Sequence, residues 1–158
     1  MADLQYTEYF LYPATLYVSN SPCMINTVLG SCVAVCLWDT ERKIGGMNHF
    51  MMPLWNGDGL ASPKFGNIAI PKLIENIVAY GCNRQNLIAK VFGGGEVLET
   101  TSSQFMIGTR NVQIAFETLQ ELNIRVISKC VGGKSGRKIL FNTYTGEVLH
   151  KYIEKTTL

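Results

Sequence analysis

The sequence lacks the patterns that mark several large classes of protein. Its 14 Lys and Arg residues are scattered and its net charge is only +2, so it has no basic stripe of the kind that binds nucleic acid. No apolar run approaches the length of a membrane span, and residues 1–10 lack the cationic start and apolar core of a secretory signal. We therefore expect a cytoplasmic protein that neither binds nucleic acid nor inserts into a membrane.

Cysteine and histidine are both sparse. The chain has five cysteines, an odd number with no CxxC spacing, which argues against a disulfide framework and against a zinc site. It has only two histidines, His49 and His150. A thiol–imidazole pair therefore has few places to form.

What is present is the composition of one globular domain spanning residues 1–158. Hydrophobic residues make up 47% and charged residues 16%, as in soluble proteins with a sizeable core. Short apolar segments bounded by turn residues predict strands, and segments with helical spacing predict helices. The predicted strands cover 15–19, 23–28, 32–38, 44–52, 87–92, 124–131, 137–141 and 148–153, and the helices cover 70–78, with Pro71 in the first turn, and 112–122. This pattern indicates a mixed α+β fold.

Two of the predicted strands bring Cys32 and His49 together. The strands are separated by the polar run 39–43, a pattern typical of a hairpin. Cys32 opens the first strand and His49 lies near the end of the second, so antiparallel pairing returns His49 toward the level of Cys32. The pair favours a cysteine hydrolase or transferase. The simpler alternative is a buried cysteine and a histidine that is hydrogen-bonded near the core.

Glycines lie in two segments relevant to this pair. Gly30 and Ser31 precede Cys32 at a strand's edge, where unpaired backbone N–H groups are suited to hold a developing oxyanion. Gly93 and Gly94 follow another strand but do not satisfy GxGxxG. There we expect a tight turn, or a close approach of backbone to substrate, rather than a phosphate-binding loop.

Five motifs occur in order between about residue 15 and the C-terminus. They are Gly-Ser-Cys-Val-Ala-Val (30–35), Gly-Met-Asn-His-Phe-Met-Met-Pro (46–53), Lys-Val-Phe-Gly-Gly-Gly (90–95), Ile-Gly-Thr-Arg-Asn-Val (107–112), and Val-Gly-Gly with Gly-Arg-Lys (131–133 and 136–138). In sequence and spacing, these motifs resemble the chemoreceptor glutamine deamidase family, CheD.

The resemblance implies a hydrolase that converts specific glutamines of methyl-accepting chemotaxis receptors to glutamate and releases ammonia. It implies a layered α/β/β/α fold with mixed β-sheets, shared with bacterial toxin deamidases. It also implies that Cys32 and His49 are the catalytic pair. Thiol chemistry of this kind requires no metal or organic cofactor.

The third catalytic residue departs from the family pattern. The resemblance implies a threonine six residues before the cysteine, where this chain has Asn26, with Thr27 one place later. Adjacent side chains in a strand point to opposite faces, so only one of the two is expected to face the site. We prefer Asn26, because an amide carbonyl accepts the imidazole N–H as in Cys-His-Asn sites, and place Thr27 second.

Two other roles remain open at the level of sequence. Because the family is similar to proteins that bind a CheC-type response-regulator phosphatase, the chain is alternatively a regulatory binding module with little catalysis of its own. A structural β-rich interaction domain is the third possibility. In that case Cys32 would be unreactive toward alkylating reagents in the folded protein.

Overall fold

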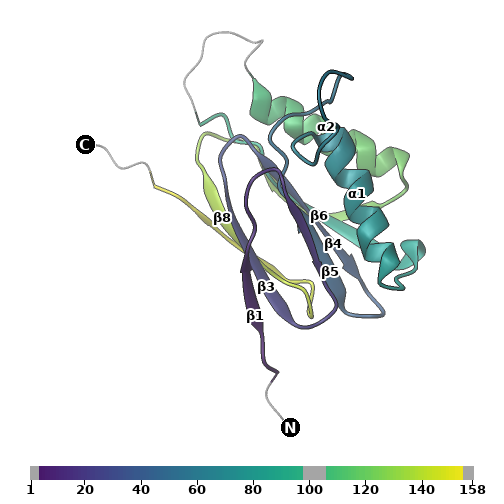
Figure 1. The fold of residues 1–158 in the computed structure, drawn as a ribbon. Helices are drawn as coiled ribbons and strands as arrows, with labels where there is room; N and C mark the ends of the chain where they lie inside the picture. Colours follow the sequence, from purple (N-terminus) through teal and green to yellow (C-terminus); the bar gives the residue numbers. More distant parts are fainter. Residues whose placement is uncertain (1–3, 98–105, 155–158) are drawn as a thin grey trace.

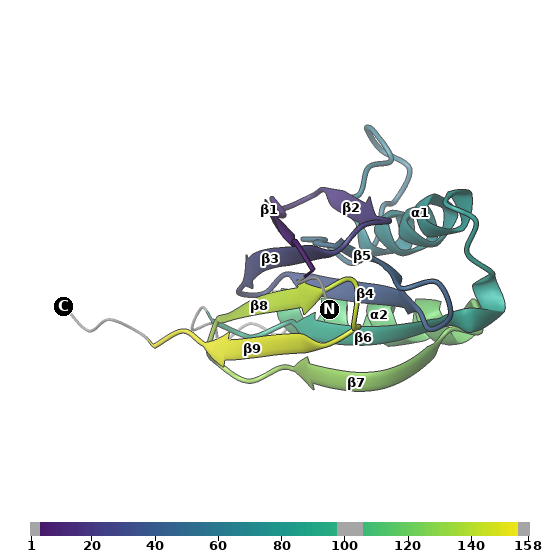
Figure 2. The same ribbon diagram turned by 90° about the horizontal axis from the view of Figure 1, so that it is seen from below.

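Two β-sheets pack face to face, and two helices cover the outer face of one of them (Figures 1 and 2). The computed structural model describes residues 4–97 and 106–154. One sheet has four strands, in the order β1 (Thr7–Phe10), β3 (Cys23–Leu29), β8 (Arg137–Asn142) and β9 (Val148–Tyr152). The other has five, in the order β2 (Leu16–Ser19), β5 (Ile44–Asn48), β4 (Val33–Asp39), β6 (Leu87–Gly93) and β7 (Arg125–Val131). Both sheets are mixed, because β1 runs parallel to β3 and β6 runs parallel to β7.

The five-stranded sheet is covered on both faces. The helices α1 (Gly66–Ala79) and α2 (Ile107–Glu121) pack on one face, and the four-stranded sheet packs on the other. In β4, Val33 and Val35 belong to the core under the helices, whereas Ala34 and Cys36 belong to the core between the sheets. Burial on both sides explains why β4 is a nearly continuous apolar run.

The four-stranded sheet is covered on one face only. Alternate residues of β3 are buried and the residues between them are more exposed, the pattern of a sheet with one open face. Among the described residues no helix covers that face, so the structure has three layers where the resemblance implied four. The reason is that both helices pack on strands of the other sheet: α1 on β2, β4 and β5, and α2 on β4, β6 and β7. The α+β class is confirmed; the second helical layer is not present in the described chain.

Most predicted elements are present, and the differences have local causes. Strand β1 was not predicted; it is an exposed edge strand without a buried face to give it a periodic apolar pattern. Helix α1 begins at Gly66, so Pro71 lies inside the helix rather than in its first turn. Proline has no N–H to donate to the carbonyl four residues earlier, so one helical bond is missing there.

The turn between β4 and β5 is fixed by a single carboxylate. Asp39 Oδ1 accepts hydrogen bonds from the backbone N–H groups of Glu41 (2.7 Å) and Arg42 (2.9 Å). Lys43, which completes the turn, has a φ of 56°. Because turn geometry sets the register of a hairpin, this turn determines which residues of β4 and β5 face each other.

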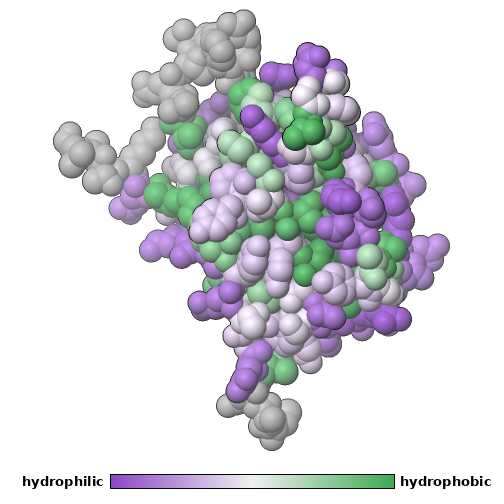
Figure 3. Space-filling view, viewed as in Figure 1, coloured by the Kyte–Doolittle hydropathy of each residue, from purple (hydrophilic) through white to green (hydrophobic). Residues whose placement is uncertain are grey.

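The surface carries scattered apolar side chains. Figure 3 shows hydrophobic residues interspersed with hydrophilic ones on the face seen in Figure 1. Tyr9 and Phe10 of the edge strand β1 are 37% and 44% exposed. Neither helix in the described parts of the chain is long and apolar enough to cross a membrane.

Candidate active site

Cys32 lies where the chain passes from one sheet to the other. Residues 30–32 connect β3 of the four-stranded sheet to β4 of the five-stranded sheet. The connection is held by the glycine run after β6: the Gly94 N–H donates to the Cys32 carbonyl (2.8 Å), and the Gly95 N–H donates to the Gly30 carbonyl (3.0 Å). The Cys32 side chain is a half-buried free thiol.

Positions 93 and 94 require glycine, because the backbone there has positive φ values and Gly93 approaches Cys32 closely. Gly93 and Gly94 have φ values of +107° and +69°, in the region that L side chains rarely adopt. A Cβ on Gly93 would overlap the carbonyl oxygen of Cys32. Residues 94–97 do not form the expected tight turn; the backbone here approaches the backbone of Cys32 instead. The Gly94 N–H is already engaged, so Gly93 and Gly94 position the Cys32 backbone and do not supply that N–H to an oxyanion.

His49 lies on the same face of the five-stranded sheet as Cys32. Val33 pairs with Phe50 and Cys36 pairs with Met47, and this register puts His49 opposite residue 34. Cys32 is therefore the diagonal neighbour of His49, a relation in which Cα atoms lie about 7–8 Å apart. The predicted antiparallel return of His49 toward Cys32 is confirmed.

Thr27 is the residue that holds the imidazole. Its Oγ1 lies 2.7 Å from His49 Nδ1 and 2.7 Å from the carbonyl oxygen of Leu11. The carbonyl can only accept, so the single hydroxyl hydrogen of Thr27 points to Leu11, and Thr27 Oγ1 accepts the N–H at Nδ1. This inferred tautomer leaves the lone pair on Nε2, which is buried and has no hydrogen-bond partner among the described residues. His49 is thus set to accept a proton at Nε2.

Asn26 points away from this arrangement. Its Nδ2 donates to the carbonyl of Tyr9 in the neighbouring strand β1 (3.2 Å), on the open face of the four-stranded sheet. The alternation of side chains along β3 puts Thr27 inside and Asn26 outside. The preference for Asn26 over Thr27 is therefore reversed: the register of β3 against the other sheet, which a single sequence does not reveal, decides which residue faces His49.

Burial sets the protonation states of the pair. It lowers the pKa of His49 from 6.5 to about 4, because a charged imidazolium loses its hydration there. Burial also raises the pKa of the Cys32 thiol above its ordinary value, and a hydrogen bond from the backbone of Cys32 offsets part of that rise. At neutral pH the resting pair is a neutral thiol beside a neutral imidazole, and no hydrogen bond joins the two in the described structure.

Two backbone N–H groups beside the thiol donate to no other described residue, although the Cys32 N–H also interacts with its own sulfur. Within the described residues, neither the Ser31 nor the Cys32 N–H donates to an acceptor on another residue. Such groups are available to a negatively charged oxygen that forms next to the sulfur. Of the residues predicted for the oxyanion, Ser31 keeps an N–H that donates to no other part of the described chain, whereas Gly30 contributes its carbonyl as the acceptor from Gly95.

Asn111 supports the site and was not singled out from the sequence as a site residue. It is fully buried in α2, and its Nδ2 donates to the carbonyls of Ser31 and Met51, each at 3.0 Å. One side chain thus ties together the segments that carry Cys32 and His49. Asn111 lies one residue before the predicted helix 112–122, at helical spacing from the apolar Ala115 and Leu119. A polar residue on that face was the available signal.

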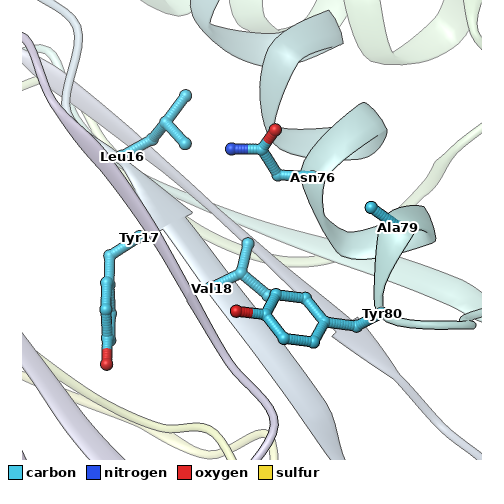
Figure 4. Close-up of a pocket in the computed structure, with 6 residues that line it drawn as sticks. All are labelled: Leu16, Tyr17, Val18, Asn76, Ala79 and Tyr80. Carbon is cyan, nitrogen blue, oxygen red and sulfur yellow. The ribbon is translucent and has the colours of Figure 1, made fainter.

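A cavity of about 450 Å³ lies away from the site residues, between β2 and α1. It is lined by Leu16, Tyr17, Val18, Asn76, Ala79 and Tyr80 (Figure 4). The ring of Tyr17 points away from α1. None of the predicted site residues lines it. Among residues 4–97 and 106–154, no three His, Cys, Asp or Glu side chains gather as metal ligands would.

Comparison with known sequences identifies related proteins. A sequence model of the family described as CheD, chemotactic sensory transduction, matches residues 51–152. A protein of Trichlorobacter lovleyi is 53% identical over 142 residues, covering 90% of this chain and 88% of its own. A protein of Sulfurimonas denitrificans is 47% identical over 154 residues, covering 97% of this chain and 99% of its own.

A more distant relative, from Methanococcus vannielii, is 36% identical over 132 residues, covering 83% of this chain and 86% of its own. All three relatives are named as probable chemoreceptor glutamine deamidases, CheD. The family model begins after both Cys32 and His49, whereas the alignment with the Sulfurimonas protein leaves out only a few residues of this chain.

Proposed function

Because this chain belongs to the CheD family, we propose that it is a protein-glutamine deamidase that acts on chemoreceptors. The relatives' names supply the substrate, and the Thr27–His49 hydrogen bond of 2.7 Å beside Cys32 carries the proposal for the chemistry. The whole chain acts as one deamidase domain. Since the glutamines lie on the cytoplasmic helices of methyl-accepting receptors, the cytoplasm is the proposed place of action.

The reaction begins with proton transfer from Cys32 to His49. Both groups are neutral at rest, so Nε2 takes the thiol proton as the sulfur attacks the side-chain carbonyl of the glutamine. A carbon–sulfur bond forms and the carbonyl oxygen becomes negative. The N–H groups of Ser31 and Cys32, which donate to no other residue that the structure describes, stabilise that oxyanion.

Collapse of the tetrahedral intermediate releases ammonia. The imidazolium donates its proton from Nε2 to the departing nitrogen, and the carbon–nitrogen bond breaks to leave a thioester on Cys32. Water then gives a proton to the same Nε2 and attacks the thioester. The carbon–sulfur bond breaks, the imidazolium returns that proton to the sulfur, and the product leaves as glutamic acid, which ionises to glutamate. Throughout, Thr27 keeps the ring oriented by accepting the Nδ1–H, and no step needs a metal or an organic cofactor.

The test is peptide mass spectrometry of a chemoreceptor cytoplasmic fragment incubated with wild-type protein or with Cys32→Ala. We expect conversion of particular glutamines to glutamates by the wild type, and none by the folded variant. Equal conversion by both proteins would overturn the assignment of Cys32. Conversion by neither would overturn the deamidase and favour a regulatory binding role toward a CheC-type phosphatase.

A further inference from the structure

A cluster of polar side chains around one cysteine lies at the edge of the two packed sheets opposite to β1 and β2. It joins β7, the edge strand of the five-stranded sheet, to β9, the edge strand of the four-stranded sheet, and Figure 2 shows the two strands along the same rim. The cluster consists of Cys130 on β7, Arg137 on β8, and His150 and Tyr152 on β9. None of these residues belongs to the Cys32–His49 site.

Three polar groups converge on the Cys130 sulfur. Arg137 Nη1 lies 3.2 Å from Sγ, the Tyr152 hydroxyl oxygen 3.4 Å, and His150 Nε2 3.5 Å. The Cys130 side chain is only partly buried, and Tyr152 is 52% exposed. The sulfur is therefore accessible while it is surrounded by groups able to donate hydrogen bonds.

Arg137 gives the cluster a fixed positive charge. The residue is fully buried, although the group is charged at any accessible pH. The guanidinium is held by the carbonyls of Cys130 (2.6 Å) and Gly132, and it lies over the Tyr152 ring at 5.2 Å. Because this cation touches the sulfur, a metal cation is disfavoured there, whereas an anionic group is stabilised.

Tyr152 and His150 are placed to act on a small molecule at the sulfur. The hydrogen bond with Cys130 raises the pKa of Tyr152, so its O–H remains a donor in neutral solution. The His150 and Tyr152 rings meet edge to face with centroids 5.5 Å apart, which fixes both beside the thiol. The arrangement has a nucleophile, a fixed cation and two proton carriers.

We propose that Cys130, Arg137, His150 and Tyr152 form a modification site at which a small hydroperoxide oxidises the Cys130 thiol to sulfenic acid. The sulfur attacks one peroxide oxygen, a sulfur–oxygen bond forms and the oxygen–oxygen bond breaks. The leaving oxygen takes a proton from Tyr152 or His150. The proton of the Cys130 thiol then passes to that same residue and restores it. With hydrogen peroxide the balance is thiol plus peroxide to sulfenic acid plus water, so sulfur is oxidised and peroxide reduced.

The position of the cluster connects it to the glycine run that holds Cys32. Arg137 binds the Gly132 carbonyl, the Gly132 N–H donates to Gly93 (2.9 Å), and the Glu96 N–H donates to Gly133 (2.8 Å). Residues 132–133 therefore link the Cys130 cluster, through hydrogen bonds, to the glycine run that holds the backbone of Cys32. The proposed chemistry at Cys130 does not depend on whether the chain is a deamidase.

The experiment measures sulfenic acid in the folded full-length protein carrying Cys32→Ala, which removes the other half-buried thiol. The protein is treated with hydrogen peroxide and dimedone, and the labelled peptides are identified by mass spectrometry. We expect label on Cys130 at peroxide doses that leave the buried Cys23, Cys36 and Cys82 unlabelled. Absence of label on Cys130, or equal labelling of all four cysteines in the folded protein, overturns the proposal.

Variants of β9 show whether the reactivity of Cys130 comes from its neighbours or only from the exposure of its thiol. Tyr152→Phe and His150→Ala should each slow labelling of Cys130 by about three- to tenfold, the loss of one hydrogen bond in the transition state. Lys151→Ala is the matched control, because Lys151 is exposed and lies between the two residues on the opposite face of β9. Unchanged rates in both cluster variants, or an equal loss in Lys151→Ala, contradict a built site.

Discussion

Thr27 and Asn26 are neighbours in β3, yet their side chains have different surroundings. Thr27 is buried against His49 Nδ1, whereas Asn26 bonds the backbone of the edge strand β1. Both residues have an oxygen able to accept an imidazole N–H. The side of the strand, and not the chemistry of the group, therefore determines which residue orients the base.

Removing the Thr27 hydroxyl should reduce catalysis. A hydrogen bond to a charged imidazolium contributes about 1.5–3 kcal/mol, so Thr27→Val should lower kcat/KM by about 10- to 100-fold. Thr27→Ser, which keeps the hydroxyl, should recover most of the activity, and Asn26→Ala should change kcat/KM by less than about twofold. Initial deamidation rates check this, and a larger loss in Asn26→Ala than in Thr27→Val would refute the role of Thr27.

The depressed pKa of His49 predicts an unusual acid limb. The imidazole acts as a base only when neutral, and burial lowers its pKa to about 4. The value of kcat/KM should therefore stay level as pH falls from 7 to about 5 and decline toward pH 4. The profile is measured with circular dichroism to confirm folding at each pH. An acid limb centred near the ordinary histidine value of 6.5 would mean that the ring is hydrated.

The end of β6 should tolerate no side chain at Gly93. Gly93→Ala places a Cβ against the Cys32 carbonyl at a φ of +107°. We expect it to lower the free energy of unfolding by about 3 kcal/mol or more and to abolish deamidation. The matched control is Gly59→Ala, which also has a positive φ but nothing within 4 Å, and should cost only about 1–2 kcal/mol. Urea unfolding compares the two; equal losses would show that the close approach is unimportant.

Helix α2 contributes to the site through Asn111. Asn111→Ala leaves two partly buried carbonyls, those of Ser31 and Met51, without their donor, which should cost about 1–3 kcal/mol. The segment with Cys32 should also loosen, so its alkylation by iodoacetamide should become faster in the folded protein. Gln113→Ala, an exposed change on the same helix, should stay within about 0.5 kcal/mol of the wild type. Alkylation at an unchanged rate in Asn111→Ala would remove Asn111 from the account of the site.

The site belongs to the docked pair of sheets and to neither sheet alone. Thr27 comes from the four-stranded sheet, His49 follows β5 of the five-stranded sheet, and Cys32 lies in the connection between them. The core between the sheets, which includes Phe141 and Met47, keeps the sheets together. Activity and tertiary structure should therefore be lost together.

Urea titration tests whether activity and tertiary structure are lost together. Deamidation and the fluorescence of Trp38, whose indole N–H bonds Thr143 across the two sheets (3.0 Å), should fall with one midpoint. The measurement uses a Trp55→Phe background so that Trp38 alone reports. Loss of activity well before the fluorescence changes would mean that the site opens while the sheets remain docked.

Local patterns predicted much of this molecule, and long-range placement accounts for the rest. The β4–β5 hairpin, and with it the approach of Cys32 and His49, follows from two apolar runs and the polar turn between them. The face of β3 that meets His49 depends on the packing of two sheets, which no local pattern records. The contact of Cys130 with His150 likewise depends on two edge strands from different sheets.

The central claim is that the Cys32 sulfur attacks the glutamine carbonyl. The most direct test uses a receptor-derived peptide whose glutamine side chain ends in a chloromethyl ketone, which alkylates the attacking nucleophile. Peptide mass spectrometry should find the adduct on Cys32, much slower labelling in His49→Gln, and no adduct on Cys130. An adduct on Cys130, or labelling of Cys32 at the same rate without the imidazole, would contradict the account.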